Sequence, residues 1–195
     1  MTTSPATQSD SAVREIAYVA VFAALIVALT LFPAIVLPFT PVPITLQTFA
    51  VSLAAIVLGA RRGTISVAIY LALIAIGLPV AAGYVGGLGV FAGATGGFLV
   101  GFLVQAAVTG LLATWVIRHK NANTFLLFLA ALAGTVPLFI IGTAWLMAVT
   151  GLSLGPAIAA AVTPFILGDI IKSALAALVS AGVFKALPAL AERHR

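Results

Sequence analysis

The segment TPFILGDIIKSALAALVS, residues 163–180, is apolar enough to cross a lipid bilayer and yet contains an aspartate and a lysine. Asp169 and Lys172 are three positions apart, so an α-helix would place both side chains on one face. A charged group in the membrane interior costs about 2.5 kcal/mol or more, and such groups usually face a cavity or another helix. The segment therefore predicts a membrane helix with a polar site on one side.

The composition of the chain agrees with this interpretation. Of 195 residues, 63% are hydrophobic and 7% are charged, a balance that ordinary soluble domains do not have. Apolar runs long enough to cross a hydrocarbon core of about 30 Å occur at 16–32, 44–60, 64–80, 97–117, 124–148 and 163–186. We predict an all-α polytopic membrane protein with six transmembrane helices. Residues 1–15 are expected to form a disordered cytoplasmic tail, and residues 16–195 a single six-helix transmembrane domain.

Positive charge is divided unequally between the connections. Eight of the nine Lys and Arg residues lie in the N-terminal tail, the second-to-third connection, the fourth-to-fifth connection and the C-terminal end: Arg14, Arg61, Arg62, Arg118, Lys120, Lys185, Arg193 and Arg195. The other connections, 33–43, 81–96 and 149–162, have no charged residue. The positive-inside rule then predicts that both termini are cytoplasmic. The net charge of +5 is explained by topology and needs no nucleic-acid partner.

The position of the polar pair in its helix favours access from outside. Thr163 and Pro164 are typical of a helix start, so Asp169 and Lys172 would lie roughly 8–14 Å below the outer end of the helix. A carboxylate accepts hydrogen bonds and an ammonium donates them. Together they suit a ligand with N–H donors beside a carbonyl, such as a urea or an amide. The alternative is a structural salt bridge that joins two helices.

Two outer segments are candidates for the walls of such a site. A Gly-rich outer loop between the predicted third and fourth helices, AAGYVGGLGVFAGATGGF (81–98), has seven glycines, so its backbone can approach a ligand closely. Tyr84, Gly86 and Gly87 are its candidate contacts, and a flexible or tightly packed re-entrant loop is the alternative. Thr45 and Gln47 lie near the outer end of the second helix, where they would either cap the helix or contact the ligand.

Other patterns concern partners and chemistry. Ala20 and Ala24 are four positions apart in the first helix, a spacing that allows close helix packing, either within the protein or against another membrane subunit. No G-x-x-x-x-G-K-[ST] loop for ATP is present, and His119 and His194 have no neighbours at metal-ligand spacing. We therefore expect neither an enzyme nor a metal site. A stand-alone small-solute facilitator, or a proton or ion channel using Asp169, remains an alternative to a substrate-binding transporter component.

Four stretches resemble the biotin transporter (BioY) family, which comprises the substrate-binding S components of energy-coupling-factor (ECF) transporters. They are PVPITLQTF (41–49), LGARRG (58–63), IGLPVAAGYVGGLGVFAGATGGFLVGF (76–102) and PFILGDIIKSALAAL (164–178). Their order and spacing cover nearly the whole chain after the tail. Two positions depart from the family pattern: Ala94 stands where a proline is expected, and Phe98 where a tyrosine is frequent.

The resemblance implies a six-helix protein of the cytoplasmic membrane of a prokaryote, with an outward-facing pocket for biotin. Asp169 and Lys172 would be the polar pair that binds the vitamin, and the Gly-rich loop would close over it. Ala20 and Ala24 would dock onto a membrane coupling protein that works with ATP-hydrolysing subunits. Biotin would be the transported ligand, and no cofactor is implied.

Overall fold

The structure, a computed structural model, describes residues 5–194, with side chains from residue 13 onward. Within this part every regular element is a helix, which confirms the all-α prediction. The helices are α1 (Pro5–Thr30), α2 (Gln47–Ala75), α3 (Gly89–Ala92), α4 (Gly96–His119), α5 (Thr124–Thr150), α6 (Leu154–Ala161), α7 (Ile166–Ala186) and α8 (Pro188–Glu192). Five of them, α1, α2, α4, α5 and α7, are long and apolar enough to cross a membrane.

Helix α2 is folded back on itself at Gly59. The backbone there has φ +79° and is not helical, a conformation that glycine adopts without the strain a side chain would add. Gln47 near the start of α2 is hydrogen-bonded to Tyr70 near its end, and Ala55 lies against Gly63. Both pairs are nearly symmetric about Gly59, so the two halves of α2 run antiparallel. They correspond to the separate runs predicted at 44–60 and 64–80.

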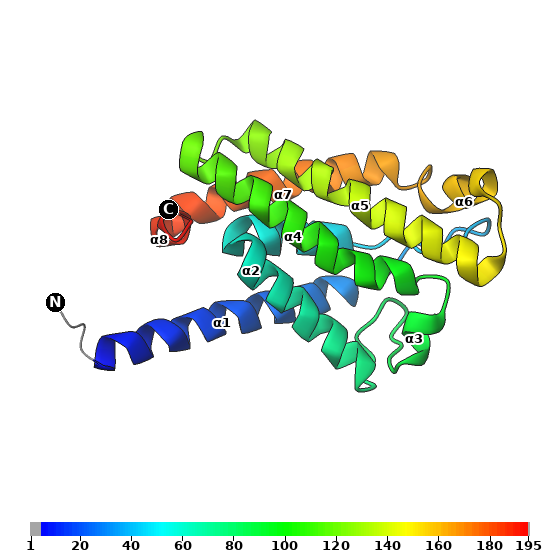
Figure 1. The fold of residues 1–195 in the computed structure, drawn as a ribbon, viewed down its shortest axis with the longest axis horizontal. Coiled ribbons are helices and arrows are strands. Elements are labelled where there is room, and N and C mark those ends of the chain that lie inside the picture. Colours follow the sequence, from blue (N-terminus) through cyan, green and yellow to red (C-terminus); the bar gives the residue numbers. More distant parts are fainter. Residues whose placement is uncertain (1–4, 195) are drawn as a thin grey trace.

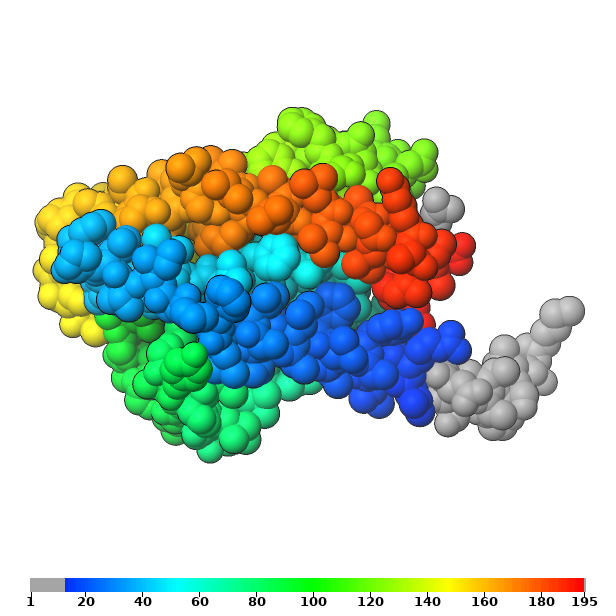
Figure 2. Space-filling view, turned by 180° about the vertical axis from the view of Figure 1, so that it is seen from behind, coloured from blue at the N-terminus to red at the C-terminus, as the bar shows by residue number. Residues whose placement is uncertain are grey.

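The long helices form a bundle with two distinct ends (Figure 1). Helix α1 begins and α8 ends at one end, while α3, α6 and the connection 31–46 lie at the other. Seen from behind, the first half of α2 is visible between α1 and α7 (Figure 2), so both helices flank it. Contacts at the second end join segments distant in sequence: the Thr40 hydroxyl donates to Ala160 O at 2.8 Å.

The start of α1 differs from the tail predicted to be disordered over residues 1–15. The helix begins at Pro5, and residues 1–4 and Arg195 lie outside the described residues. Glu15 forms ion pairs with Arg62 of α2 and Arg193 after α8, and Arg193 also lies 4.7 Å from the centre of the Tyr18 ring. These contacts tie Glu15, the last residue of the predicted tail, to the rest of the bundle.

Candidate ligand-binding site

A cavity of about 370 Å³ lies at the end of the bundle that holds α3 and α6. Its volume is within the range of small-molecule sites. The walls come from the connection 31–46, the start of α2, helices α4, α5 and α7, and the Gly-rich loop, which contributes Ala81, Ala82, Gly83, Val85, Val90 and Thr95. All these segments are brought to one place only by the fold, so the cavity joins residues that are more than a hundred positions apart in the sequence.

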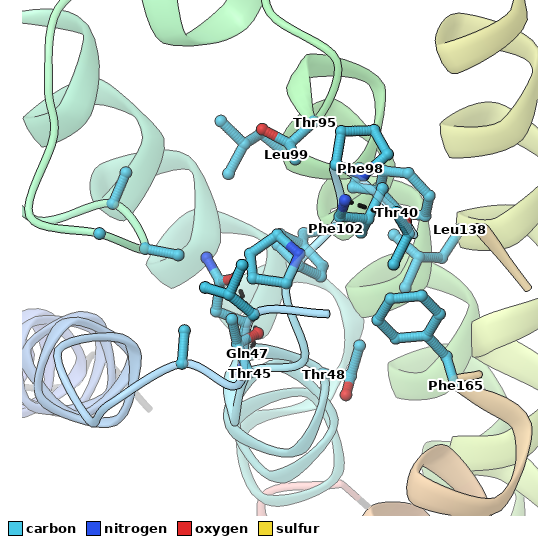
Figure 3. A pocket seen from close by; sticks show the side chains of 18 of the residues that line it. Thr40, Thr45, Gln47, Thr48, Thr95, Phe98, Leu99, Phe102, Leu138 and Phe165 are labelled. Atoms are coloured by element: carbon cyan, nitrogen blue, oxygen red, sulfur yellow. Dashed lines mark hydrogen bonds between the residues drawn. The ribbon is translucent and has the colours of Figure 1, made fainter. Parts of the chain in front are cut away.

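One side of the cavity is apolar and rich in aromatic rings. Phe98, Phe102, Leu138 and Phe165 lie on this side, and Thr45 and Gln47 lie away from them (Figure 3). The aromatic side chains are held by burial in the same core cluster that packs α4 against α5. Such rings give a ligand a large apolar contact area with little loss of side-chain freedom. The cavity therefore suits a ligand that is mainly apolar.

Asp169 and Lys172 form the charged part of the cavity wall. They are 3% and 8% exposed, and they make an ion pair along one face of α7. The Thr48 hydroxyl donates to Asp169 Oδ1 at 2.8 Å, and Lys172 Nζ donates to Thr45 O at 3.2 Å. The closest approach of Lys172 is also to Oδ1, so Oδ2 is the carboxylate oxygen left to accept from a ligand.

The ammonium group also keeps part of its bonding capacity. Lysine carries three N–H donors, and two are used by Asp169 and Thr45 O. One donor thus remains beside the free carboxylate oxygen. An acceptor and a donor side by side in a buried, mostly apolar cavity can bind a planar group that offers the complementary pair. The spacing of three residues predicts a shared helical face, and in the structure both side chains line the cavity from α7.

Thr45 and Gln47 both line the cavity and also stabilise the start of α2. The Thr45 hydroxyl donates to Gln47 Oε1 at 2.9 Å and accepts from Gln47 N at 3.3 Å. Gln47 Nε2 donates to the Tyr70 hydroxyl at 2.7 Å, which joins the two halves of α2. The N-cap residue of α2 is Leu46, and no side chain caps the helix there. Thr45 and Gln47 therefore line the cavity without the predicted capping role, and their contact with a ligand stays a prediction.

The Gly-rich loop contributes to the cavity through other residues than those predicted. The residues of 81–98 that line it are Ala81, Ala82, Gly83, Val85, Val90, Thr95 and Phe98. Tyr84 does not: its side chain is 63% exposed, and its hydroxyl donates to Leu31 O at 3.0 Å.

Gly86 and Gly87 also lie outside the cavity lining and instead hold the loop against the end of α2. A Cβ on Gly86 would be 2.2 Å from Leu78 O, so the two backbone segments are in direct contact. The Gly87 N–H donates to Ile74 O at 2.7 Å, and Ala81 N–H donates to Val85 O at 3.0 Å. The loop is therefore a packed wall whose lining residues depend on this contact.

Gln105 of α4 is a buried residue beside the site that the sequence analysis did not identify. Its Nε2 donates to Thr48 O at 3.2 Å and to Ser52 Oγ at 3.0 Å, so it fixes the turn that carries the Thr48 hydroxyl toward Asp169. The signal was present in the sequence, because Gln105 is the sole amide side chain in the apolar run 97–117. The aromatic wall had no such signal, since aromatic residues are common throughout the membrane segments.

Comparison with known proteins adds independent observations. A model of the BioY family matches residues 1–189. Biotin transporter BioY of Rhizobium etli is 49% identical over 148 residues, which are 74% of this chain and 79% of the relative. Biotin transporter BioY of Rhodobacter capsulatus is 47% identical over 141 residues, 71% of this chain and 73% of the relative. The crystal structure of an S-component for biotin from an ECF-type ABC transporter matches with a TM-score of 0.83 and 30% identity, covering 94% of this chain and 95% of that one.

Proposed function

The chain belongs to the BioY family, and from this premise we propose that it binds biotin and takes it up as the S component of an ECF-type transporter. It is accordingly a multi-pass membrane transport protein and not an enzyme. Biotin is its transported ligand rather than a cofactor. The observation that carries the proposal is the buried Asp169–Lys172 pair in a cavity of about 370 Å³ with aromatic walls. We place the protein in the cytoplasmic membrane of a prokaryote.

Biotin has the chemistry that this cavity complements. Its ureido ring offers two N–H donors and one carbonyl, and its thioether ring and valeryl chain are apolar. We propose that Asp169 accepts from a ureido N–H and that Lys172 donates to the ureido carbonyl. The sulfur ring would then lie against the aromatic side chains. Thr45 and Gln47 would line the ureido end, and backbone N–H groups of the loop would hold the valerate carboxylate.

Residues outside the lining have supporting roles in this proposal. Gly86 and Gly87 keep the loop against α2, and the Tyr84 hydroxyl ties it to the end of α1 through Leu31 O. These three residues would thus shape the biotin pocket without touching the ligand.

The direct test is equilibrium binding of labelled biotin to the purified protein. We expect saturable binding at one site, displaced by unlabelled biotin but not by lipoate, which has a similar acid chain and no ureido ring. Displacement by both compounds equally would assign recognition to the carboxylate alone. A protein that conducts protons or ions across vesicle membranes and shows no saturable biotin binding would instead be a channel.

We also propose six membrane crossings with both termini cytoplasmic. The antiparallel halves of α2 supply two crossings, and α1, α4, α5 and α7 supply the others. The first half of α2 is short, and the non-helical residues before it, such as Thr40 and Val42, are buried in protein. Non-helical backbone is tolerated at membrane depth when protein surrounds it.

Single cysteines will test this topology, because the chain has no cysteine of its own. In intact cells a membrane-impermeant maleimide is expected to label Ser153→Cys in the α5–α6 connection. Arg61→Cys and Lys120→Cys should react only after the membrane is permeabilised. All three positions are exposed in the structure, so a difference in labelling between them cannot be caused by burial within the protein. Labelling of Lys120→Cys in intact cells would contradict the proposed orientation.

The proposed partners are a membrane coupling protein and ATP-hydrolysing subunits. Ala20 and Ala24 are both exposed on α1, which supports their use as a docking surface. The double variant Ala20→Leu/Ala24→Leu is expected to lose most of its co-purification with the coupling subunits and to keep its biotin affinity. Larger side chains prevent the close approach that small residues allow.

The matched control for docking is Ala144→Leu/Ala148→Leu. These alanines are also exposed and four positions apart, but they lie on α5. We expect the control to co-purify as the unaltered protein does. Equal recovery of the coupling subunits with both double variants would remove α1 as the docking surface.

A further inference from the structure

A second cavity, here called the basic groove, lies at the end of the bundle opposite to the biotin cavity. It has a volume of about 1080 Å³ and lies between α1, the second half of α2, α4 and residues 193–194. Its charged lining consists of Glu15, Arg61, Arg62, Arg118 and Arg193. Its apolar lining includes Ile16, Ile65, Ile69, Leu111 and Trp115. The groove thus has a positively charged end, and the rest of its lining is largely apolar.

The positive charge of the groove is only partly compensated. Glu15 makes ion pairs with Arg62 and Arg193. Arg118 donates through Nε to His194 O, which is a neutral acceptor. Among residues 13–194, whose side chains the structure describes, neither Arg61 nor Arg118 forms an ion pair with a carboxylate, and both are exposed. Two guanidinium groups are therefore available for an anion.

His194 does not compensate these arginines and does not add to their charge. Its Nε2–H donates to Val57 O at 3.0 Å, and its Nδ1 lies 3.1 Å from Thr114 Oγ1. Burial lowers the pKa of His194, and the charges of Arg62 and Arg118 act in the same direction, although the bond to Val57 O opposes them. The ring is thus neutral at pH 7 and closes the inner wall of the groove.

The apolar length of the groove lies on helices that are long enough to cross the membrane. Ile65 and Ile69 are one turn apart on α2, and Leu111 faces the same groove from α4; all three are exposed. Trp115, 51% exposed, stacks on His119 with the ring centres 5.5 Å apart. Tryptophan is enriched where the apolar core of a membrane meets the headgroups. The groove therefore runs from the headgroup level toward the membrane interior.

We propose that the basic groove binds one anionic phospholipid of the cytoplasmic leaflet, with its phosphate on Arg61 and Arg118 and an acyl chain along Ile65, Ile69 and Leu111. Basic pockets between membrane helices on the cytoplasmic side are suited to anionic headgroups, and guanidinium groups bind phosphate with two parallel hydrogen bonds. The leaflet rests on the topology proposed above. A phospholipid suits this groove because a charged part is followed by an apolar part along the groove, as in the lipid itself.

The test uses the purified full-length chain and two lipids with the same acyl chains, phosphatidylglycerol and phosphatidylcholine. Native mass spectrometry and the shift in melting temperature report which lipid the protein retains in detergent. Neither measurement depends on the proposed membrane orientation or on biotin binding. We expect a clear preference for phosphatidylglycerol. Arg61→Gln/Arg118→Gln should reduce that preference at least tenfold, whereas Lys120→Gln/Lys185→Gln should not change it. Those two lysines are exposed and lie near the same end but outside the groove.

Each other outcome contradicts the proposal in a different way. Equal retention of both lipids by the unaltered protein means that no anionic lipid site exists. Protection by inorganic phosphate equal to that by phosphatidylglycerol means that the groove takes a free anion. The Arg61→Gln/Arg118→Gln variant could also keep its lipid preference and lose co-purification with the coupling subunits. That result would mean that the groove binds a partner protein. Unchanged biotin affinity checks that the variant is folded, because the biotin cavity lies at the other end.

Discussion

Asp169→Asn is expected to weaken biotin binding at least about tenfold, which corresponds to about 1.4 kcal/mol. The amide removes the charge that balances Lys172 and places an N–H₂ group in a site where Thr48 and Lys172 already donate. An unpaired buried polar group costs about 1–3 kcal/mol, and more when it is charged. Lys172→Met should weaken binding by a similar factor, because Asp169 then loses its counter-charge. Titration of purified variants with labelled biotin measures both effects.

Ser180→Ala is the matched control for these two variants. Ser180 is buried on the same helix, and its hydroxyl donates to Ala176 O within that helix at 2.7 Å. It does not line the cavity. Its loss should leave biotin affinity unchanged. If Asp169→Asn and Lys172→Met also bind biotin with unchanged affinity, the pair is a structural salt bridge and the proposed ligand contacts are wrong.

Ligand analogues distinguish two ways in which biotin could contact Lys172. The Asp169→Asn and Lys172→Met variants are expected to weaken binding in both. If Lys172 serves the ureido carbonyl, biotin methyl ester and biotin amide should bind nearly as well as biotin, and an analogue without the intact ureido ring should bind poorly. If Lys172 pairs with the valerate carboxylate, the order is reversed. The position of Lys172 Nζ beside Asp169 and Thr45 O favours the first pose, since the pair then faces one small planar group.

The sequence could predict the charged pair because a carboxylate and an ammonium in an apolar run carry a high energetic cost. Their burial in one cavity follows from this cost and the helical spacing. The apolar runs also predicted every long helix, although the runs at 44–60 and 64–80 are the two halves of α2. The turn between them depends on Gly59, whose left-handed backbone conformation is compatible with many other roles of a glycine. The short helices α3 and α6 have too few residues for a clear pattern.

The loop was harder to predict in detail than the helices. Seven glycines indicate that the backbone approaches something closely, but they do not indicate what it approaches. In the structure Gly86 approaches the backbone of Gly77 and Leu78, just after α2, and not the cavity. The Tyr84 hydroxyl donates to Leu31 O. Contacts between two backbone segments leave no pattern in side-chain chemistry. Gln105 differs from these residues, because an amide within an apolar run is a visible signal of a buried hydrogen bond.

Gly86→Val is expected to weaken biotin binding about tenfold or more while the helix bundle stays folded. A Cβ at this position would lie 2.2 Å from Leu78 O and 2.7 Å from Leu78 C, so the loop must move away from the end of α2. The Gly87 bond to Ile74 O would break, and the lining residues Ala81 to Gly83 would move with the loop. Binding titration together with the melting temperature separates loss of the pocket from loss of the fold.

Gly89→Val is the matched control for the loop, because it makes the same change three positions later. Gly89 is exposed at the start of α3, and a Cβ there meets no atom within 4 Å. It should bind biotin as the unaltered protein does, since nothing forces the loop to move. Equal affinity in the two variants would mean that the contact of Gly86 with Gly77 and Leu78 does not shape the pocket. The loop would then be a connection between α2 and α4 that biotin does not need.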